Sequence, residues 1–286
     1  MRVSPSQLKT YKECEQQWYY SYIDNLKPKM RRTVAVDVGN YTHELMHVMY
    51  QFLQAFPDVK PGSDEVMDMM MARIKNDVEN GNLDSISTTN IVMKLMTRYI
   101  TWQSPRIDKG ITVLGVEKDF MITLGNFGLI LNGFIDLVYR DAAGNIRIRD
   151  HKTSGQKNSW NEKKLKLLEQ LLLYCLAMQE ELKEPVLRVE VNYVNTYQYA
   201  GTPPPSTEIY KIFRHTHTPA VLDSYRRNLE LMHDRMVQIS EGASPIRNFH
   251  DGCGSCRFYE LCNLETKGLD SSTTKQYLFQ TIDKNE

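Results

Sequence analysis

One predicted β-strand constrains the fold more than any other feature of the sequence. In the stretch IRIRDHKTSG, residues 146–155, side chains alternate between two faces, with Ile146 and Ile148 on one face and two arginines on the other. The apolar face continues with Asp150 and Lys152. Burying either charge alone is costly, so the end of this face needs charged partners or a metal ion.

A second predicted apolar strand also contains a charged residue. Asp136 belongs to LNGFIDLVY, which is apolar on both faces and therefore predicts a central strand. A hairpin register would bring it close to Asp150 and Lys152. Two carboxylates repel each other unless a divalent cation lies between them, and such oxygen ligands suit Mg²⁺ or Mn²⁺. Lys152 would then hold a water or stabilise phosphate charge, with Glu117 as a third carboxylate; a structural Asp–Lys pair is the alternative.

The rest of the pattern predicts an α/β sandwich around a mixed sheet. Ser4 is expected as an N-cap, with Pro5 at the first helical position and Gln7 closing a capping box. Further helices are expected from about residue 38, over 64–103 with a break near 80–88, over 165–182 and over 218–240. Strands are expected over 111–124, 129–139, 145–152, 187–195 and 208–215. The polar residues after Gly268 lack a core pattern and are expected to be flexible.

Composition excludes some classes of protein. The 286 residues are 41% hydrophobic and 24% charged, as in a globular protein, and 35 basic residues balance 35 acidic ones, so only a local patch could attract nucleic acid. No apolar run approaches the roughly 20 residues of a membrane span, and the N-terminus lacks the apolar region of a signal peptide. We therefore expect a cytoplasmic protein without a membrane partner.

Four short motifs carry a family resemblance. Asp136 followed by Asp150-x-Lys152 resembles the signature of the PD-(D/E)XK nuclease superfamily, and the flanking GFIDLVY and RDHKTSG are similar to its RecB-type branch. That branch also has a Gln-x-x-x-Tyr helix and a Gly-x-x-x-His motif, which match residues 170–174 and 39–43. The i, i+4 spacing places the glutamine and tyrosine on one helix face.

The resemblance implies a restriction-endonuclease-like core: a central mixed sheet flanked by helices, with an N-terminal helical region and an iron–sulfur-bound C-terminal segment. It implies that the metal ligands are His43, Asp136, Asp150 and the main-chain carbonyl of His151. It also implies that Lys152 is catalytic and that Gln170 and Tyr174 contact DNA or support the site. Taken separately, these residues have structural alternatives: His43 has a rival in His47, and Glu117 is the weakest match.

The cysteines form a second pattern. Cys253-x₂-Cys256-x₅-Cys262 is a ligand loop, with Cys14 as a distant fourth thiolate, and this spacing alone suits either Zn²⁺ or a 4Fe–4S cluster. The arrangement resembles that of the iron–sulfur nucleases, which include the CRISPR-associated Cas-four-type exonucleases and the AddB nuclease domain. SPSQLKTYKECEQQWYYSYI is similar to their N-terminal helix, with Glu15 where the family often has proline. The resemblance therefore implies a 4Fe–4S cluster.

The function implied is a Mg²⁺- or Mn²⁺-dependent DNA exonuclease acting at single-stranded ends in recombination, repair or CRISPR adaptation. A helicase, a recombinase or a CRISPR adaptation protein is the expected partner. The alternative is a non-catalytic iron–sulfur module that binds DNA or a partner. The expected domain covers residues 1–267, with a helical region at about 40–105, a nuclease core at about 106–217, cluster ligands at 14 and 253–262, and a tail over 268–286.

Candidate DNA contacts are basic and aromatic. The basic candidates could equally form a solvated face; they are Lys27, Lys29, Arg31, Arg32, Lys157, Lys163 and Lys164. Tyr174 is expected beside the DNA. The aromatic residues Trp18, Tyr19, Tyr20 and Tyr22 either stack bases or, as is commoner for so dense a group, pack into a core.

Overall fold

The computed structural model describes residues 1–29, 34–83, 86–125, 128–156, 160–166, 168–196 and 205–281, without the side chains of 34–37 and 86–87. Its residues form two compact units. The sheet unit comprises residues 32–122 and 133–225, and the cysteine unit comprises residues 1–31, 123–132 and 226–286. Each unit is described separately below.

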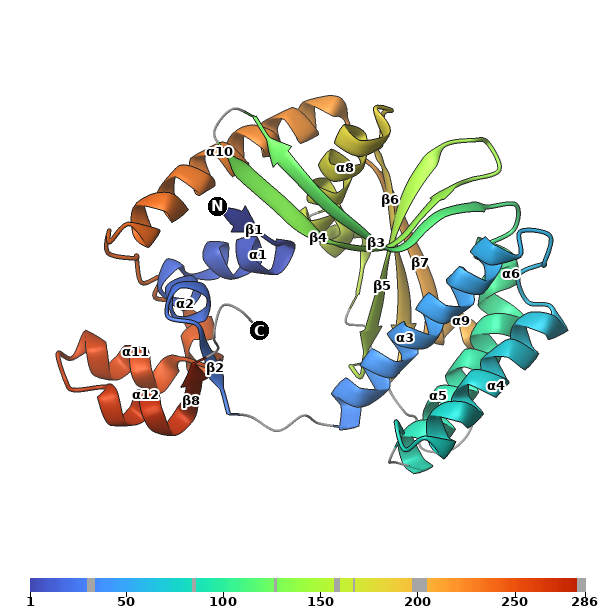
Figure 1. Ribbon diagram of the computed structural model, residues 1–286, viewed down its shortest axis with the longest axis horizontal. Coiled ribbons are helices and arrows are strands. Elements are labelled where there is room, and N and C mark those ends of the chain that lie inside the picture. The colour runs from blue at the N-terminus through green and yellow to red at the C-terminus, as the bar shows by residue number, and fades with distance from the viewer. Residues whose placement is uncertain are drawn as a thin grey trace. The chain divides into compact units, whose positions relative to one another are not determined.

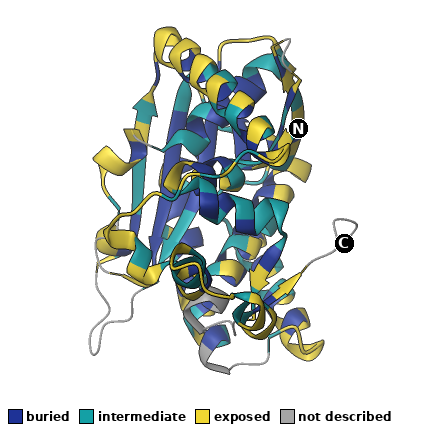
Figure 2. Ribbon diagram, turned by 90° about the vertical axis from the view of Figure 1, so that its left-hand side faces the viewer, coloured by how far each residue is buried: buried dark blue, intermediate teal, exposed yellow. Residues whose placement is uncertain are grey.

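A mixed sheet organises the chain, as the sequence predicted. Strand β5, Ile146–Ser154, pairs antiparallel with β4, Leu129–Arg140, and parallel with β6, Arg188–Asn195. Strand β7, Tyr210–Thr216, pairs antiparallel with β6, and β3, Thr112–Leu124, pairs with β4. Strand β1, Arg2–Val3, pairs parallel with the first residues of β4, within the cysteine unit. Figure 2 shows the central strands as largely buried.

Helices cover both faces of β5 in the sheet unit. Helix α3, Val34–Ala55, packs on β5, and Figure 1 shows it together with α4, Asp64–Glu79, and α5, Ile86–Arg98. Helix α8, Glu169–Leu182, packs on β5 and β6. Three short helices complete the unit; they are α6, Ser104–Ile107, α7, Glu162–Lys166, and α9, Ser206–Ile209. A π-helical turn, Tyr99–Gln103, joins α5 to α6.

The cysteine unit has a small core of its own. Its elements are α1, Pro5–Glu13, α2, Glu15–Trp18, a π-helical turn, Tyr19–Ile23, β2, Leu26–Pro28, a 3₁₀ turn, Asp251–Ser255, α11, Tyr259–Thr266, α12, Ser272–Leu278, and β8, Phe279–Thr281. Helix α10, Pro219–Ser240, begins in the sheet unit and continues into this one. A buried cluster contains residues from both the N-terminal and the C-terminal segment of this unit; they are Tyr20, Leu26, Phe258, Leu261 and Phe279.

The N-terminal helix starts as predicted but is interrupted. The Ser4 side chain caps α1 by accepting a hydrogen bond from the Gln7 main-chain nitrogen, and Pro5 begins the helix. Cys14 has an extended backbone between α1 and α2, with φ −167° and ψ 123°. The break allows the main-chain nitrogen of Gln16 to bond the carbonyl of Ile246. The sequence pattern did not reveal this break, because it depends on a contact distant in the chain.

The C-terminal segment differs from the expected flexible tail. Residues 272–281 form α12 and β8, and β8 pairs antiparallel with β2. Phe279 is buried, and its ring stacks on Phe258 at 5.1 Å between centroids. A single buried aromatic residue produces no periodic pattern, which is why the sequence did not reveal this element. Residues 282–286 lie outside the described residues.

Candidate metal and active site

Strand β5 brings a carboxylate and an ammonium group to the middle of the sheet. Asp150 is fully buried, and its Oδ1 and Oδ2 lie 3.0 and 2.9 Å from Lys152 Nζ. The Lys152 side chain stays 30% exposed, so its ammonium remains within reach of solvent. Lys152 therefore supplies the charge partner that a buried Asp150 requires.

Asp136 lies at the end of the antiparallel pairing between β4 and β5. The last main-chain pair is Leu137 opposite Arg149, and Asp136 and Asp150 are the next residues of the two strands. Here Asp136 Oδ2 accepts a hydrogen bond of 2.6 Å from the main-chain nitrogen of His151. The structure thus places Asp136 and Asp150 at adjacent positions of neighbouring strands, as the hairpin register predicts, but Asp150 is not among the described donors that lie within 4.8 Å of one another.

Helix α3 delivers a histidine to these strands. His43 Nε2 lies 3.1 Å from Asp136 Oδ2 and 3.1 Å from the carbonyl oxygen of His151. Gly39 lies one turn earlier, and a Cβ there would lie only 2.8 Å from Thr153 Oγ1 on β5. Glycine is therefore required for the close approach of the helix, which explains the spacing of the Gly-x-x-x-His motif.

Glu117 completes a compact group of donors. Its Oε1 lies 3.7 Å from His43 Nδ1, and one donor atom each from His43, Glu117 and Asp136 fall within 4.8 Å of one another. Glu117 has a left-handed backbone with φ 43° inside strand β3. Such a conformation costs a non-glycine residue about 1–3 kcal/mol, and it is often found at functional sites.

A hydrogen-bonded chain links Lys152 to helix α8. Lys152 Nζ donates to Gln170 Oε1 at 3.3 Å, and Gln170 Nε2 donates to the Tyr174 hydroxyl at 2.6 Å. Leu168 is extended just before α8 begins, so Gln170 lies in the first turn of the helix. Tyr174 is buried against Phe120, with 5.9 Å between ring centroids. Gln170 of the Gln-x-x-x-Tyr motif therefore bonds Lys152 directly, and Tyr174 is connected to Lys152 through Gln170.

Burial and neighbouring charges shift the pKa values of the carboxyl groups in this site. Burial raises the pKa of Asp150 to about 6, the charge of Asp136 adds to this, and Lys152 opposes it. Burial and the charge of Asp136 also raise the pKa of Glu117. Burial acts against ionised Asp136 too, but hydrogen bonding and charge from His43 outweigh it and lower the pKa of Asp136. Three carboxylates thus lie near one ammonium group and the imidazoles of His43 and His47, and a divalent cation would stabilise the ionised form of the buried carboxylates.

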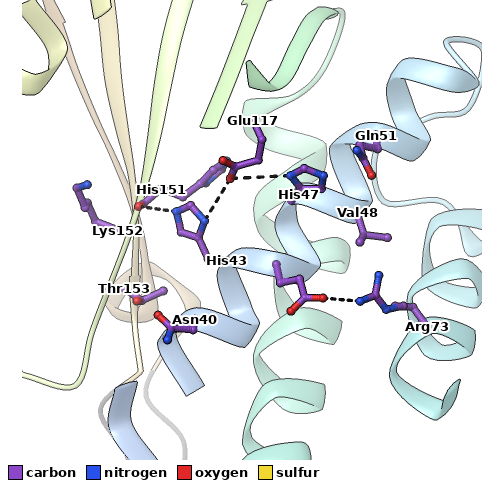
Figure 3. A pocket seen from close by; sticks show the side chains of 12 residues that line it. Asn40, His43, His47, Val48, Gln51, Arg73, Glu117, His151, Lys152 and Thr153 are labelled. Atoms are coloured by element: carbon purple, nitrogen blue, oxygen red, sulfur yellow. Dashed lines mark hydrogen bonds and ion pairs between the residues drawn. The ribbon is translucent and has the colours of Figure 1, made fainter. Parts of the chain in front are cut away.

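The donor set fits a divalent metal ion. Carboxylate oxygens from Glu117 and Asp136, a nitrogen of His43 and the His151 carbonyl are ligands of the kind that Mg²⁺ and Mn²⁺ accept. A cavity of about 710 Å³ adjoins them. It is lined by His43, His47, Glu117, Lys152 and others, and Figure 3 shows Glu117 between the two histidines. Solvent and a ligand therefore have access to this group.

One part of the site was missed by the sequence analysis. Arg149 is fully buried and bonds Asp108, Glu190 and the Tyr50 hydroxyl. On the same face, Asn192 Nδ2 lies 2.9 Å from His151 Nδ1. His151 therefore rests on a buried polar network while its main chain contacts the candidate ligands. The alternation of charged residues along both β5 and β6 was the available signal.

The four predicted cluster ligands line one cavity in the cysteine unit. This cavity has a volume of about 640 Å³, and its lining includes Cys14, Cys253, Cys256 and Cys262. All four are half-buried and free of disulfides. Burial raises the pKa of Cys256, and the neighbouring thiols add to this. Among the described residues, no three of these sulfur atoms lie within 4.8 Å of one another.

Only some of the candidate DNA contacts are among the described residues. Arg31, Arg32 and Lys157 lie outside the described residues. Lys27 is exposed, and Lys29 Nζ donates to the carbonyl of Gln276 at 2.8 Å. Lys163 and Lys164 are exposed on α7. Trp18 and Tyr20 are buried, so these two rings pack in a core rather than offering a surface for bases.

Sheet, helices and donor group together define an α/β protein with a candidate metal-binding site. The model of the PD-(D/E)XK nuclease superfamily matches residues 2–263, and the chain belongs to this superfamily. The match spans nearly the whole chain, including both compact units.

One solved structure in particular shows a similar fold. The crystal structure of a candidate exonuclease from Eubacterium rectale is 13% identical, covers 89% of this chain and 87% of its own, and has a TM-score of 0.54. The structure of SSO0001 is 14% identical over 67% of this chain and 80% of its own, with a TM-score of 0.36. A search of curated proteins found no match. Among the described residues, none of the helices has the length and apolar character needed to span a lipid bilayer.

Proposed function

We propose that this protein is a metal-dependent deoxyribonuclease that hydrolyses phosphodiester bonds, with single-stranded DNA ends as its substrate. The observation that carries the proposal is the convergence of His43, Glu117 and Asp136 within 4.8 Å, next to the buried Asp150–Lys152 pair. Membership of the nuclease superfamily supports the class of reaction. The likeness to a candidate exonuclease supports the fold on which it rests.

The residues have separate roles in the proposal. His43, Asp136, Asp150 and the carbonyl of His151 hold a divalent ion, Mg²⁺ or Mn²⁺. When bound, the ion supplies Lewis acidity toward a phosphate oxygen and a more acidic water. Lys152, half-exposed and bonded to both Asp150 and Gln170, orients the attacking water or stabilises charge on the phosphate. Gln170 and Tyr174 keep the Lys152 ammonium in place through their own hydrogen bond.

We propose a structural 4Fe–4S cluster at Cys14, Cys253, Cys256 and Cys262. The cysteines fit a group with four thiolate ligands because they line a single cavity. A single zinc ion also accepts four thiolates. A cluster is proposed over zinc because the ligand pattern, one N-terminal and three C-terminal cysteines, resembles that of the iron–sulfur nucleases. The cluster would connect α1 and α2 to the C-terminal loop and stabilise the cysteine unit.

The wider setting follows from these proposals. Residues 1–267 are proposed to act as one nuclease domain, since the family match runs through both units. Arg31, Arg32 and Lys157 are proposed DNA contacts, whereas Tyr174, which is buried, is proposed to support the site through Gln170. A helicase, recombinase or CRISPR adaptation protein is the proposed partner, and a cytoplasmic location, with roles in repair or recombination, stays a prediction from sequence.

Degradation of end-labelled single-stranded DNA tests the proposal. Wild-type protein should cut only with Mg²⁺ or Mn²⁺, and Asp150→Asn and Lys152→Ala should each slow cutting by at least about 10²–10³-fold. Lys109→Ala, which removes an exposed lysine of the same unit, is the matched control and should cut normally. Circular dichroism and thermal unfolding check that each variant is folded.

Two outcomes count against the proposal. Cutting that survives both Asp150→Asn and Lys152→Ala would remove these residues from the reaction. A wild-type protein that binds DNA without cutting it, with either metal, would favour the non-catalytic iron–sulfur module instead.

A further inference from the structure

His43 presents its two ring nitrogens to two different groups of donors. Nε2 lies 3.1 Å from Asp136 Oδ2 and 3.1 Å from the His151 carbonyl oxygen. Nδ1 lies 3.7 Å from Glu117 Oε1. The lone pairs of the two nitrogens diverge in the ring plane, so one imidazole cannot direct both at one ion. The Nδ1 side is therefore distinct from the position formed by Nε2, Asp136 and His151.

His47 joins Glu117 on this second side. It lies four residues after His43 on α3, which places both histidines on one helix face. Its Nδ1 lies 3.9 Å from the same Glu117 Oε1. A dashed line marks this pair in Figure 3. Separations of 3.7 and 3.9 Å exceed those of hydrogen bonds, which are about 2.7–3.2 Å. They remain below the roughly 4.2 Å that separates two ligands on opposite sides of an ion with bonds of about 2.1 Å.

Glu117 can serve both sides of His43. It belongs to the compact group with His43 and Asp136, and it also contacts His47. A carboxylate has two oxygen atoms and can bridge two ions, which lie about 3.5–4 Å apart in two-metal hydrolases. Its left-handed backbone, φ 43°, interrupts the regular strand at this residue alone among the described residues of β3. The strained conformation is thus found at the one β3 carboxylate that contacts both histidines.

We propose that Glu117 and His47 form a second divalent-cation position, and that Glu117 bridges it to the position at His43, Asp136 and His151. The proposal deepens the nuclease function and rests on it for its role in cleavage. The adjoining cavity of about 710 Å³ gives water molecules or phosphate oxygens access as the remaining ligands. An imidazole ligand favours a first-row transition ion over Mg²⁺ at this position.

Mn²⁺ binding in the absence of DNA tests the proposal. The number of bound Mn²⁺ ions is obtained from the electron paramagnetic resonance signal of the free ion, with an Asp136→Asn/His47→Ala double variant as background. Wild-type protein should bind two ions above that background, and the bound pair should show an exchange-coupled spectrum. His47→Ala should bind one ion without coupling. Gln51→Ala, one turn further along the same cavity wall, should keep both ions.

The outcomes separate this inference from the proposed function. A single ion in wild-type protein, or two coupled ions in His47→Ala, overturns the second position. The His47 side chain is 26% exposed, so its removal should leave the fold intact, and His47→Gln repeats the test with a side chain of similar size. An enzyme that cuts DNA but binds one ion refutes only this inference. A protein that binds two coupled ions but never cuts refutes only the nuclease proposal.

Discussion

The two proposed metal sites of this chain are built in different ways. In the sheet unit, donors from His43, Glu117 and Asp136 lie within 4.8 Å of one another, and His43 and Asp136 are hydrogen-bonded to the main chain of β5. In the cysteine unit, four thiols line a cavity of about 640 Å³, and no three of these described sulfurs come so close. Protein contacts hold the first donor group together, whereas the second set of ligands would be completed by the proposed group.

The difference follows from what surrounds each site. The sheet unit has a large buried cluster contributed by α3, α4, α5 and the strands β4, β6 and β7, and α3 also packs on β5. Among the described residues, the buried cluster that involves the C-terminal segment has five members, and other buried side chains of the unit, such as Leu8, Leu229 and Met236, lie outside it. A cluster this small stabilises that segment only weakly, so the proposed metal group would contribute to its folding free energy. Loss of the ion should therefore affect activity at one site and stability at the other.

The largest effect is expected at the cysteine site. Cys14→Ala should lower the free energy of unfolding by about 3–5 kcal/mol, because it removes a ligand of a structural group. The visible absorption of the cluster should also be lost. Cys175→Ala is the matched control: this fully buried cysteine lies in α8, away from any proposed ligand set, and its loss should cost only packing energy. Thermal unfolding and absorption spectra measure both, and an equally stable, equally coloured Cys14→Ala protein would break the comparison.

The next largest effect is expected at Asn192, whose side chain contacts His151 in the sheet unit. Asn192 is fully buried and bonds His151 Nδ1 at 2.9 Å and the Tyr99 hydroxyl at 2.8 Å. Asn192→Leu leaves two buried polar groups without this partner, which should cost about 2–4 kcal/mol. Because the His151 main chain contacts both His43 and Asp136, Mn²⁺ affinity should also fall, by about 10-fold or more. Calorimetric titration with Mn²⁺ checks this, and unchanged affinity would show that the network does not position the site.

A smaller effect is expected where α3 approaches β5. The Cβ of Gly39→Ala would lie 2.8 Å from Thr153 Oγ1, so the helix must shift, at a cost of about 1–2 kcal/mol. In a Thr153→Ala background the clash is absent, and alanine should instead stabilise the helix by about 0.5–1 kcal/mol. Gly254→Ala, which meets open space in the cysteine unit, is the control. Denaturant unfolding of wild type, Gly39→Ala, Thr153→Ala, the double variant and Gly254→Ala gives the sign, and a Gly39→Ala cost that persists without the threonine hydroxyl would refute the explanation.

The smallest effect is expected at His217, the residue that follows strand β7. Burial, with a lesser contribution from the charge of His215, lowers the pKa of His217 from 6.5 to about 4. The folded protein therefore stays unprotonated where the unfolded chain takes up a proton. Stability is fully present above pH 6.5 and should fall by about 1–2 kcal/mol as the pH drops toward 4. His217→Phe should reduce this dependence in unfolding curves; an unchanged slope would mean that His217 does not contribute.

The sequence predicted the parts of the site whose signal is local. Asp136, Asp150 and Lys152 stood out because a charge in an apolar strand needs an explanation, and the structure brings all three to neighbouring strands. The mixed sheet and the N-cap at Ser4 also follow from short-range pattern. The sequence signal for each of these features lies within a single short segment, even where the segments pair over a long distance in the chain.

The features that were missed depend on distant contacts. The ion-pair partners of Arg149 are Asp108 and Glu190, each 41 residues away, so alternation within β5 could not show that this arginine is buried. The break at Cys14 and the left-handed backbone of Glu117 likewise come from tertiary packing rather than from propensity. The C-terminal strand β8 was missed because a single buried residue, Phe279, holds it in place.

Crystals soaked in MnCl₂ and measured for anomalous scattering would test the central claim most directly. The account predicts a strong anomalous peak in contact with His43, Asp136 and the carbonyl oxygen of His151. A well-ordered map in which these three residues keep their present contacts, with manganese bound only elsewhere, would contradict it.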